Sequence, residues 1–221
     1  MKVVKQLWSN NPYFYSLFVG FLLVGAVILA FIDQGADILF VNQYRSDFGD
    51  AFFRFATTLG EAYIYIPALI LLLFVKYRHA AAVPLLGITV ILASGISKQF
   101  FAHERPFLFF KNAGLLDQID PVTGVAMHGG LTSFPSGHTM SAFAIFAFLA
   151  FSIPEKKGLG ALLFLIALLV GFSRIYLIQH FLKDVYLGAI MGVAIAVLWH
   201  WLAPKLLKSP RLEQSLIKKQ A

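Results

Sequence analysis

Residues 14–32 read FYSLFVGFLLVGAVILAFI, 19 consecutive residues without a formal charge. A helix rises about 1.5 Å per residue, so a run of this length crosses the hydrocarbon core of a bilayer, which is about 30 Å thick. Five further runs are similarly apolar: residues 56–75, 80–97, 138–154, 158–173 and 185–203. The sequence therefore predicts an all-α integral membrane protein with a bundle of six transmembrane helices.

The composition of the chain agrees with this interpretation. Of 221 residues, 59% are hydrophobic and 13% are charged, whereas soluble domains carry about 25% charged residues. An ordinary soluble globule and a disordered chain are therefore excluded. The chain has no cysteine, which excludes disulfides, thiol nucleophiles and iron–sulfur clusters. No internal repeat or second domain is visible, so residues 1–221 are predicted to form a single membrane-embedded domain.

The charged residues predict the orientation of the six helices. Eleven basic residues lie on one side of the predicted spans, with Glu155 and Glu213 as the only acids there: Lys2, Lys5, Lys76, Arg78, Lys156, Lys157, Lys205, Lys208, Arg211, Lys218 and Lys219. Seven basic and nine acidic residues lie on the other side. Because cytoplasmic loops carry the excess of Lys and Arg, both termini are predicted to be cytoplasmic. The net charge of +7 then reflects contact with anionic headgroups, and no nucleic-acid partner is expected.

Three local features modify this picture. Lys2 and Lys5 before an apolar run would also fit a signal peptide, but residues 31–33 offer no small-residue cleavage site, so the run is expected to be retained as a helix. Residues 36–55 mix phenylalanines with charges, as does an amphipathic helix in the outer interface or a packed loop helix. Pro67 and Pro84 lie inside predicted spans, where we expect kinks but no breaks.

Polar residues gather at the outward mouths of the spans, and the first group follows the third span. Residues 98–106 read KQFFAHERP. If the helix continues, Lys98 and Arg105 lie about two turns apart on nearly the same face, so that both can bind one anion. Pro106 is then expected to end the helix. Two cations anchored at the membrane interface are the alternative interpretation.

The second group, residues 133–138, reads SFPSGH and opens the fourth span. The free N–H groups of a helix start, the Ser136 hydroxyl and the close backbone approach that Gly137 allows together form an anion site, with His138 beside it. A simple turn and helix cap would use the same residue types.

The third group, residues 173–184, joins the fifth and sixth spans. It contains Arg174, and His180 and Asp184 are four residues apart. On a helical start, Asp184 accepts a hydrogen bond from one ring nitrogen of His180 and leaves the other free, as a nucleophilic or basic histidine requires. Three cations, a helix start and two histidines on one membrane face predict phosphoryl transfer. A metal site formed by His138, His180 and Asp184 is the rival, but the three cations would oppose a divalent ion.

The chain resembles the type 2 phosphatidic acid phosphatase family of integral membrane enzymes. The family patterns Lys-x6-Arg-Pro, Pro-Ser-Gly-His and Ser-Arg-x5-His-x3-Asp are complete at residues 98–106, 135–138 and 173–184. The resemblance implies that His180 attacks phosphorus to form a phosphohistidine, that Asp184 orients its ring and that His138 protonates the leaving oxygen. It assigns phosphate binding to Lys98, Arg105, Ser136, the Gly137 amide and Arg174.

The resemblance also implies a lipid phosphate substrate and no cofactor or metal. A neutral His180 and a protonated His138 predict a bell-shaped pH profile. An outward-facing site in the bacterial inner (cytoplasmic) membrane suits undecaprenyl diphosphate best, while phosphatidic acid, phosphatidylglycerophosphate and a lipid A phosphate also fit. Residues 111–132, which lie between two of the groups, are expected to set headgroup specificity.

Other functions remain open at this point. A lipid phosphotransferase would use the same phosphohistidine, and soluble vanadate-dependent haloperoxidases share the phosphate-site motifs but lack six spans. A membrane anion-binding protein or transporter would need the cations without His138, His180 and Asp184. His103 and His128 lie in the outward loop within reach of substrate, whereas the remaining histidines, His79 and His200, are predicted to be structural. The sequence predicts no oligomeric state.

Overall fold

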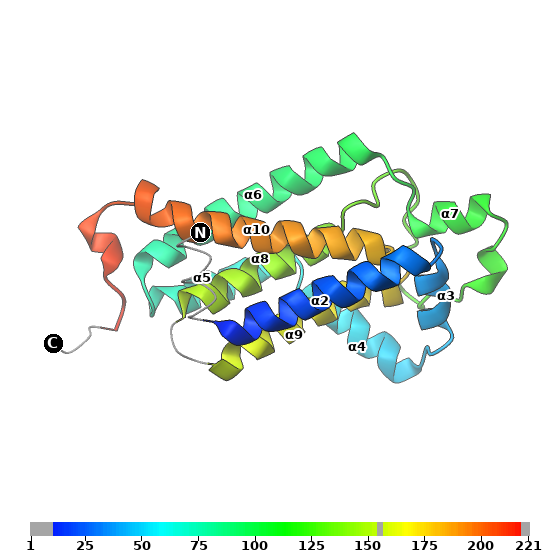
Figure 1. The fold of residues 1–221 in the computed structure, drawn as a ribbon, viewed down its shortest axis with the longest axis horizontal. Coiled ribbons are helices and arrows are strands. Elements are labelled where there is room, and N and C mark those ends of the chain that lie inside the picture. Colours follow the sequence, from blue (N-terminus) through cyan, green and yellow to red (C-terminus); the bar gives the residue numbers. More distant parts are fainter. Residues whose placement is uncertain (1–10, 154–156, 218–221) are drawn as a thin grey trace.

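The computed structural model describes residues 11–153 and 157–217, and in these ranges its regular elements are all helices (Figure 1). The α-helices are α2 (Pro12–Phe31), α3 (Ala36–Asn42), α4 (Asp47–Thr58), α5 (Tyr65–Leu73), α6 (Tyr77–Phe101), α7 (Pro106–Asn112), α8 (Gly137–Ser152), α9 (Lys157–Tyr176) and α10 (Leu182–Leu206). Short 3-10 helices are η1 (Ala62–Ile64), η2 (Leu116–Gln118) and η3 (Pro210–Glu213). Several residues of the predicted spans and of the cytoplasmic charge count lie outside the described ranges: Lys2, Lys5, Pro154, Glu155, Lys156, Lys218 and Lys219.

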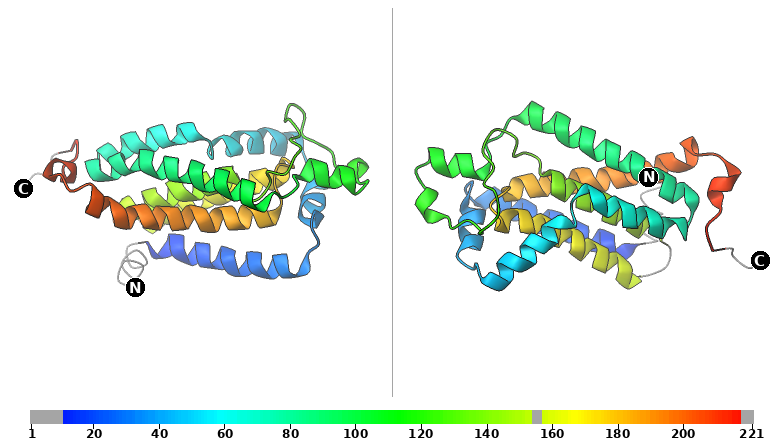
Figure 2. Two further views of the ribbon diagram at one scale, coloured as in Figure 1. Left: turned by 90° about the horizontal axis from the view of Figure 1, so that it is seen from above. Right: turned by 180° about the vertical axis from the view of Figure 1, so that it is seen from behind.

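The long helices α2, α6, α8, α9 and α10 lie side by side along the longest dimension of the molecule (Figures 1 and 2). Helices α2, α6 and α9 end where α8 and α10 begin, and α3 and α7 cover this end of the bundle. We call it the α3/α7 end. The start of α2 and the end of α10 lie at the opposite end. The antiparallel arrangement therefore collects the loops after α6 and α9 and the starts of α8 and α10 in one place.

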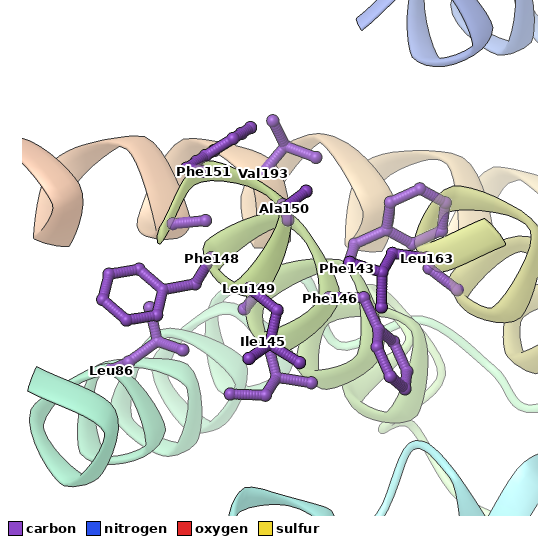
Figure 3. Close-up of a cluster of buried hydrophobic side chains, with 14 of the residues drawn as sticks. Leu86, Phe143, Ile145, Phe146, Phe148, Leu149, Ala150, Phe151, Leu163 and Val193 are labelled. Carbon is purple, nitrogen blue, oxygen red and sulfur yellow. The ribbon is translucent and has the colours of Figure 1, made fainter. Parts of the chain in front are cut away.

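Helix α8 is the centre of the bundle. Residues 139–152 are all buried, and the helix packs against α5, α6, α9 and α10. Figure 3 shows its side chains leaving on several sides, with Phe148 toward Leu86 of α6 and Phe143 toward Leu163 of α9. A helix that is apolar all round must be enclosed by other helices or by lipid. Here the protein itself encloses it, so the helix that begins at Gly137 is held rigidly.

Two glycines of α10 allow it to approach α8 closely. A Cβ atom at Gly188 would lie 2.7 Å from the Ser136 carbonyl oxygen, and one at Gly192 would lie 2.5 Å from that of Met140. No side chain fits at either distance, and small residues four apart are the usual means by which membrane helices bring their backbones together. This contact fixes the start of α10 against the start of α8.

The membrane spans agree only in part with the six that the sequence predicts. In the described part of the chain, four segments are long and apolar enough to cross a membrane: Pro12–Phe31, Tyr77–Asn112, Gly158–Tyr176 and Leu182–Leu206. Helix α8 is apolar but has 16 residues. The outer helix α2 exposes apolar side chains such as Leu23 and Val24, which suits contact with lipid. The fold is thus an all-helical membrane protein with four or five spans by these criteria.

The predicted second span, residues 56–75, is not one helix. Helix α4 ends at Thr58, and the axes of Asp47–Thr58 and Ala62–Leu73 differ by 61°. Successive backbone bonds from Gly60 to Thr57 and from Glu61 to Thr58 tighten the chain into turns at the break. The break lies before Pro67, which occupies the first turn of α5 and therefore removes no helical hydrogen bond. Pro84, in contrast, lies inside the unbroken helix α6, as expected.

The predicted helix through residues 98–106 is also wrong. Helix α6 ends at Phe101, because Ala102 adopts a left-handed conformation with φ 47° and turns the chain. Pro106 begins α7 instead of ending α6, a position where proline is favoured because no N–H is needed. Residues 36–55, expected as one interfacial or loop helix, form α3 and α4. Helix α4 exposes Phe48 while it buries Gly49 and Ala56.

Candidate active site

The residues of all three sequence groups lie at the α3/α7 end of the bundle. Lys98 belongs to the last turn of α6 and Arg174 to the last turn of α9, while Ser136 precedes α8 and Asp184 lies in the first turn of α10. Because these helices alternate in direction, their ends converge. The fold therefore brings together residues that are up to 86 positions apart in the sequence.

His180 and Asp184 form the hydrogen bond that their spacing predicts. His180 Nδ1 lies 3.2 Å from Asp184 Oδ2, and both side chains are buried. Helix α10 begins at Leu182, so His180 lies in the turn before the helix. Asp184 Oδ2 also accepts bonds from the Phe181 amide at 3.0 Å and from the Ser133 hydroxyl at 2.5 Å. With Nδ1 donating to the carboxylate, Nε2 of the imidazole is the unprotonated nitrogen.

Burial determines the protonation state of His180. Desolvation lowers its pKa from 6.5 to about 4, and the hydrogen bond that His180 donates to Asp184 opposes this shift only in part. The neutral imidazole is therefore the form present near neutral pH. A neutral imidazole with one nitrogen held by a carboxylate can act as a nucleophile through the other.

Ser136 and Gly137 form the start of α8. The Ser136 hydroxyl oxygen accepts a bond from the Thr139 amide at 3.4 Å and from the Thr139 hydroxyl at 2.9 Å, so it caps the helix. The Ser136 amide donates to the backbone oxygen of Asp184 at 3.0 Å. Gly137 approaches Lys98: a Cβ on this glycine would lie 3.6 Å from Nζ. The helix start and the end of α6 are thus in direct contact.

The three cations lie within electrostatic reach of one another. Lys98 interacts with Arg105 and Arg174, and His138 interacts with all three cations and with His180. Arg105 reaches this cluster although α6 ends earlier than predicted, because the turn at Ala102 brings the chain back. Its Nε donates to the Thr132 hydroxyl at 3.1 Å, which fixes the guanidinium. Asp184 is the buried carboxylate of the group, so the local charge favours an anionic ligand.

Arg174 is nearly enclosed, with 8% of its surface exposed. Its Nη1 donates to the Thr57 hydroxyl at 2.5 Å, and its Nε has no hydrogen-bond partner among the described residues. Burying a guanidinium without a carboxylate partner is costly unless a ligand supplies the missing acceptor. The unsatisfied Nε therefore indicates an oxyanion site at this position.

A cavity of about 770 Å³ extends from this cluster between η1, α5, α6 and α8. Lys98 and His138 line its polar end, and Ile91, Ile88 and Pro84 line it along α6. Pro84 and Lys98 are 14 positions apart, which corresponds to about 21 Å of helix. The cavity is thus long and mostly apolar, with the charged cluster at one end.

Residues 111–132, expected to set specificity, are held against α3, α4 and the turn after α9. Asp120 forms an ion pair with Arg45 at 2.7 Å, and the Gln179 side chain donates to the Ala126 carbonyl at 3.0 Å. Because Gln179 precedes His180, this loop is tied directly to the turn that holds the histidine. His128 is exposed, while the His103 ring stacks on Phe134 at 5.1 Å between centroids.

Several residues that support the cluster were not among the predicted site residues. Ser133 and Thr132 stand beside the second motif, so their position in the sequence could have indicated them. Thr57 and Asp37 could not be found this way, because their contacts are with Arg174 and the Leu182 amide, more than 100 residues later. In the part of the chain that the structure describes, no group of three His, Asp or Glu side chains is arranged to hold a metal ion. A chelator is the direct test of the metal alternative.

Comparison with known proteins identifies the family. The model of the PAP2 superfamily matches residues 78–208. An undecaprenyl-diphosphatase of Sulfolobus acidocaldarius is 30% identical over 65% of this chain and 66% of its own length. Aligned regions cover 26% to 67% of the curated relatives' lengths, so the chain spans about two thirds of any of them at most.

Two solved structures share the fold. LpxE of Aquifex aeolicus has a TM-score of 0.64 and 30% identity, covering 77% of this chain and 96% of that chain. A transmembrane PAP2-type phosphatidylglycerolphosphate phosphatase from Bacillus subtilis has a TM-score of 0.62 and 26% identity, covering 88% and 97%. Since the family model spans more than half of the chain, this integral membrane protein belongs to the PAP2 superfamily.

Proposed function

We propose that the protein is a metal-independent lipid phosphate phosphatase that works through a phosphohistidine at His180. The observation that carries the proposal is the buried, neutral imidazole of His180, held by Asp184 at 3.2 Å beside three cations. Relatives named phosphatidylglycerophosphatase B and undecaprenyl-diphosphatase support the same class of reaction.

The geometry supports a two-step reaction. In the first step, His180 Nε2 attacks phosphorus, the bond from phosphorus to the leaving oxygen breaks, and His138 donates a proton to that oxygen. Lys98, Arg105 and Arg174 stabilise the negative charge on the transferring phosphoryl oxygens, together with Ser136 and the Gly137 amide. In the second step, His138 takes a proton from water, the water oxygen attacks phosphorus, and the bond to His180 breaks to release phosphate.

The apolar cavity supports a lipid as the substrate. A phosphate at Lys98 and His138 leaves about 21 Å of apolar groove along α6, which suits one long acyl or prenyl chain. We propose undecaprenyl diphosphate as the leading substrate, with phosphatidic acid and phosphatidylglycerophosphate next. A lipid A phosphate is the alternative, since one of the similar solved structures is LpxE and a relative is named lipid A 4'-phosphatase.

For the membrane topology, we propose six spans, with α8 completed by its flanking residues and the α4 and α5 pair crossing as one bent segment. Four basic residues lie at or next to the helix ends opposite the active site: Lys76, Arg78, Lys205 and Lys208. The positive-inside rule then makes that side cytoplasmic. The active site faces the periplasm of a bacterial inner membrane, and residues 1–221 act as one domain.

The direct test is phosphate release by the detergent-purified protein. Undecaprenyl diphosphate and phosphatidic acid are supplied separately, with and without excess EDTA, beside the variant His180→Ala. We expect release that persists in EDTA and is lost in the variant, and an acid-labile, base-stable phosphoenzyme in rapidly quenched wild-type samples. Release that EDTA abolishes would overturn the metal-free mechanism. Transfer of phosphate to an added lipid, with little free phosphate, would establish a phosphotransferase instead.

A further inference from the structure

The break between α4 and η1 lies against the active site. A Cβ atom on Gly60 would lie 2.9 Å from the His138 carbonyl oxygen and 3.1 Å from the His138 Cβ. A larger residue at this position would displace His138, the turn or Val170, whose Cγ1 would lie 2.7 Å from the Cβ. The backbone of the break therefore supports the proposed general acid directly, although it lies in the span that the sequence predicted to be an unbroken helix.

The same segment holds Arg174. Thr57, in the last turn of α4, accepts a hydrogen bond from Arg174 Nη1 at 2.5 Å. Within residues 11–153 and 157–217, this is the hydrogen bond that the Arg174 side chain makes, and its Nε makes none. A long side chain with several rotatable bonds is oriented only where contacts restrict it. Thr57 supplies the polar contact that fixes the direction of the guanidinium.

We propose that Thr57 is a positioning residue for Arg174, so that the break after α4 forms part of the phosphate-binding site. The inference rests on the proposed role of Arg174 in binding the substrate phosphate. Thr57 accepts one N–H of the guanidinium, which leaves Nε and the second terminal nitrogen for phosphate oxygens. An arginine binds phosphate best through two parallel N–H groups, so its orientation decides whether both can be used.

The test compares variants that keep or remove the hydroxyl of Thr57. Thr57→Val preserves the shape of the side chain and removes the acceptor, whereas Thr57→Ser keeps it. Thr58→Val is the matched control, because among the described residues the Thr58 hydroxyl bonds only the Phe55 carbonyl of its own helix, at 2.7 Å. KM and kcat for a lipid phosphate and the inhibition constant of orthovanadate, a phosphate mimic, are measured for each. Arg174→Ala is measured alongside, and thermal unfolding midpoints are recorded for all variants.

We expect Thr57→Val to raise KM and the vanadate inhibition constant by about tenfold, as loss of a hydrogen bond to a charged group does. Thr57→Ser is expected to stay within about twofold of wild type on the same grounds, and Thr58→Val is expected to match wild type. A merely structural role would lower the unfolding midpoint without moving the vanadate constant. If Thr57→Val fails to fold, Thr57→Ala carries the same comparison.

The outcomes separate this inference from the proposed function. If wild type hydrolyses lipid phosphates, Arg174→Ala is inactive and Thr57→Val binds vanadate as Thr58→Val does, the inference is overturned and the proposed function stands. If Arg174→Ala keeps wild-type activity, the proposed role of Arg174 fails, and the positioning role of Thr57 fails with it.

Discussion

The Ser133 hydroxyl donates to Asp184 Oδ2 at 2.5 Å, the same oxygen that faces His180 Nδ1. This bond joins the segment before α8 to the start of α10, two elements that are 51 residues apart. It holds the carboxylate oxygen that also contacts the histidine. The orientation of the proposed nucleophile therefore depends on a serine that stands outside the Pro-Ser-Gly-His motif.

Ser133→Ala is accordingly predicted to lower kcat by about tenfold with little change in KM, because a hydrogen bond to a charged group contributes about 1.5–3 kcal/mol. The measurement is steady-state phosphate release beside Ser215→Ala, a control whose hydroxyl is exposed and bonds a backbone carbonyl near the end of the described chain. Equal kcat values for the two variants would mean that Asp184 is oriented without Ser133.

The pH dependence of activity follows from the depressed pKa of His180. The imidazole is neutral above about pH 4 in the folded protein, but an unperturbed imidazole titrates near 6.5. We therefore expect kcat/KM to fall as the pH drops through about 4, not through 6.5, because protonation removes the nucleophile.

The same shift predicts the stability of the fold below neutral pH. Between pH 6.5 and about 4 the unfolded chain binds a proton at His180 that the folded chain does not bind. The contribution of neutral His180 to the free energy of unfolding is therefore complete above pH 6.5 and is lost as the pH falls toward 4. Chemical unfolding in detergent at several pH values measures the free energy of unfolding, with His180→Gln as the control. If the free energy of unfolding depends on pH equally in the variant, His180 is not the source of this dependence.

The sequence predicted most of the residue cluster at the α3/α7 end because its motifs stand at helix ends. Lys98, Ser136, Arg174 and Asp184 each mark the start or end of an apolar run, and antiparallel helices bring such ends together whatever their exact packing. The hydrogen bond from His180 to Asp184 followed from their spacing, although His180 lies before the helix. Site geometry was thus predictable where it is local or depends only on helix direction.

The remaining features were not predictable because they depend on contacts between distant segments. Hydropathy alone predicted that residues 56–75 form a single span, because the turns at Gly60 do not change the number of apolar residues. The central place of α8 was equally hidden, because its composition is similar to that of the exposed helix α2. Arg105 was assigned to the right cluster for the wrong reason: the chain returns through a left-handed Ala102 and not along a continued helix.

The packing of α8 against α10 leads to a prediction about stability. Gly192→Ala would place a methyl group 2.5 Å from the Met140 carbonyl oxygen, so we expect it to destabilise the fold by about 1–3 kcal/mol. Gly20→Ala is the control, because a Cβ there meets nothing within 4 Å. Thermal unfolding in detergent compares the two, and a Gly192→Ala midpoint equal to that of Gly20→Ala would show that the helices can separate at no cost.

Glu61 either offsets the positive charge near Arg174 or holds Arg174 in place. The direction in which Glu61→Gln changes phosphate binding distinguishes these two roles. The side chain lines the cavity with Lys98 and His138 and interacts electrostatically with Arg174, but it makes no hydrogen bond to that guanidinium in the described structure. It therefore offsets positive charge without orienting Arg174.

Glu61→Gln should then lower the inhibition constant of inorganic phosphate about threefold, an effect that high salt reduces. Asp117→Asn, which removes a charge from the exposed residue of η2, is the control. Weaker phosphate binding in Glu61→Gln would instead show that the carboxylate holds Arg174 in place, and Thr57 would then share the positioning of this arginine with Glu61.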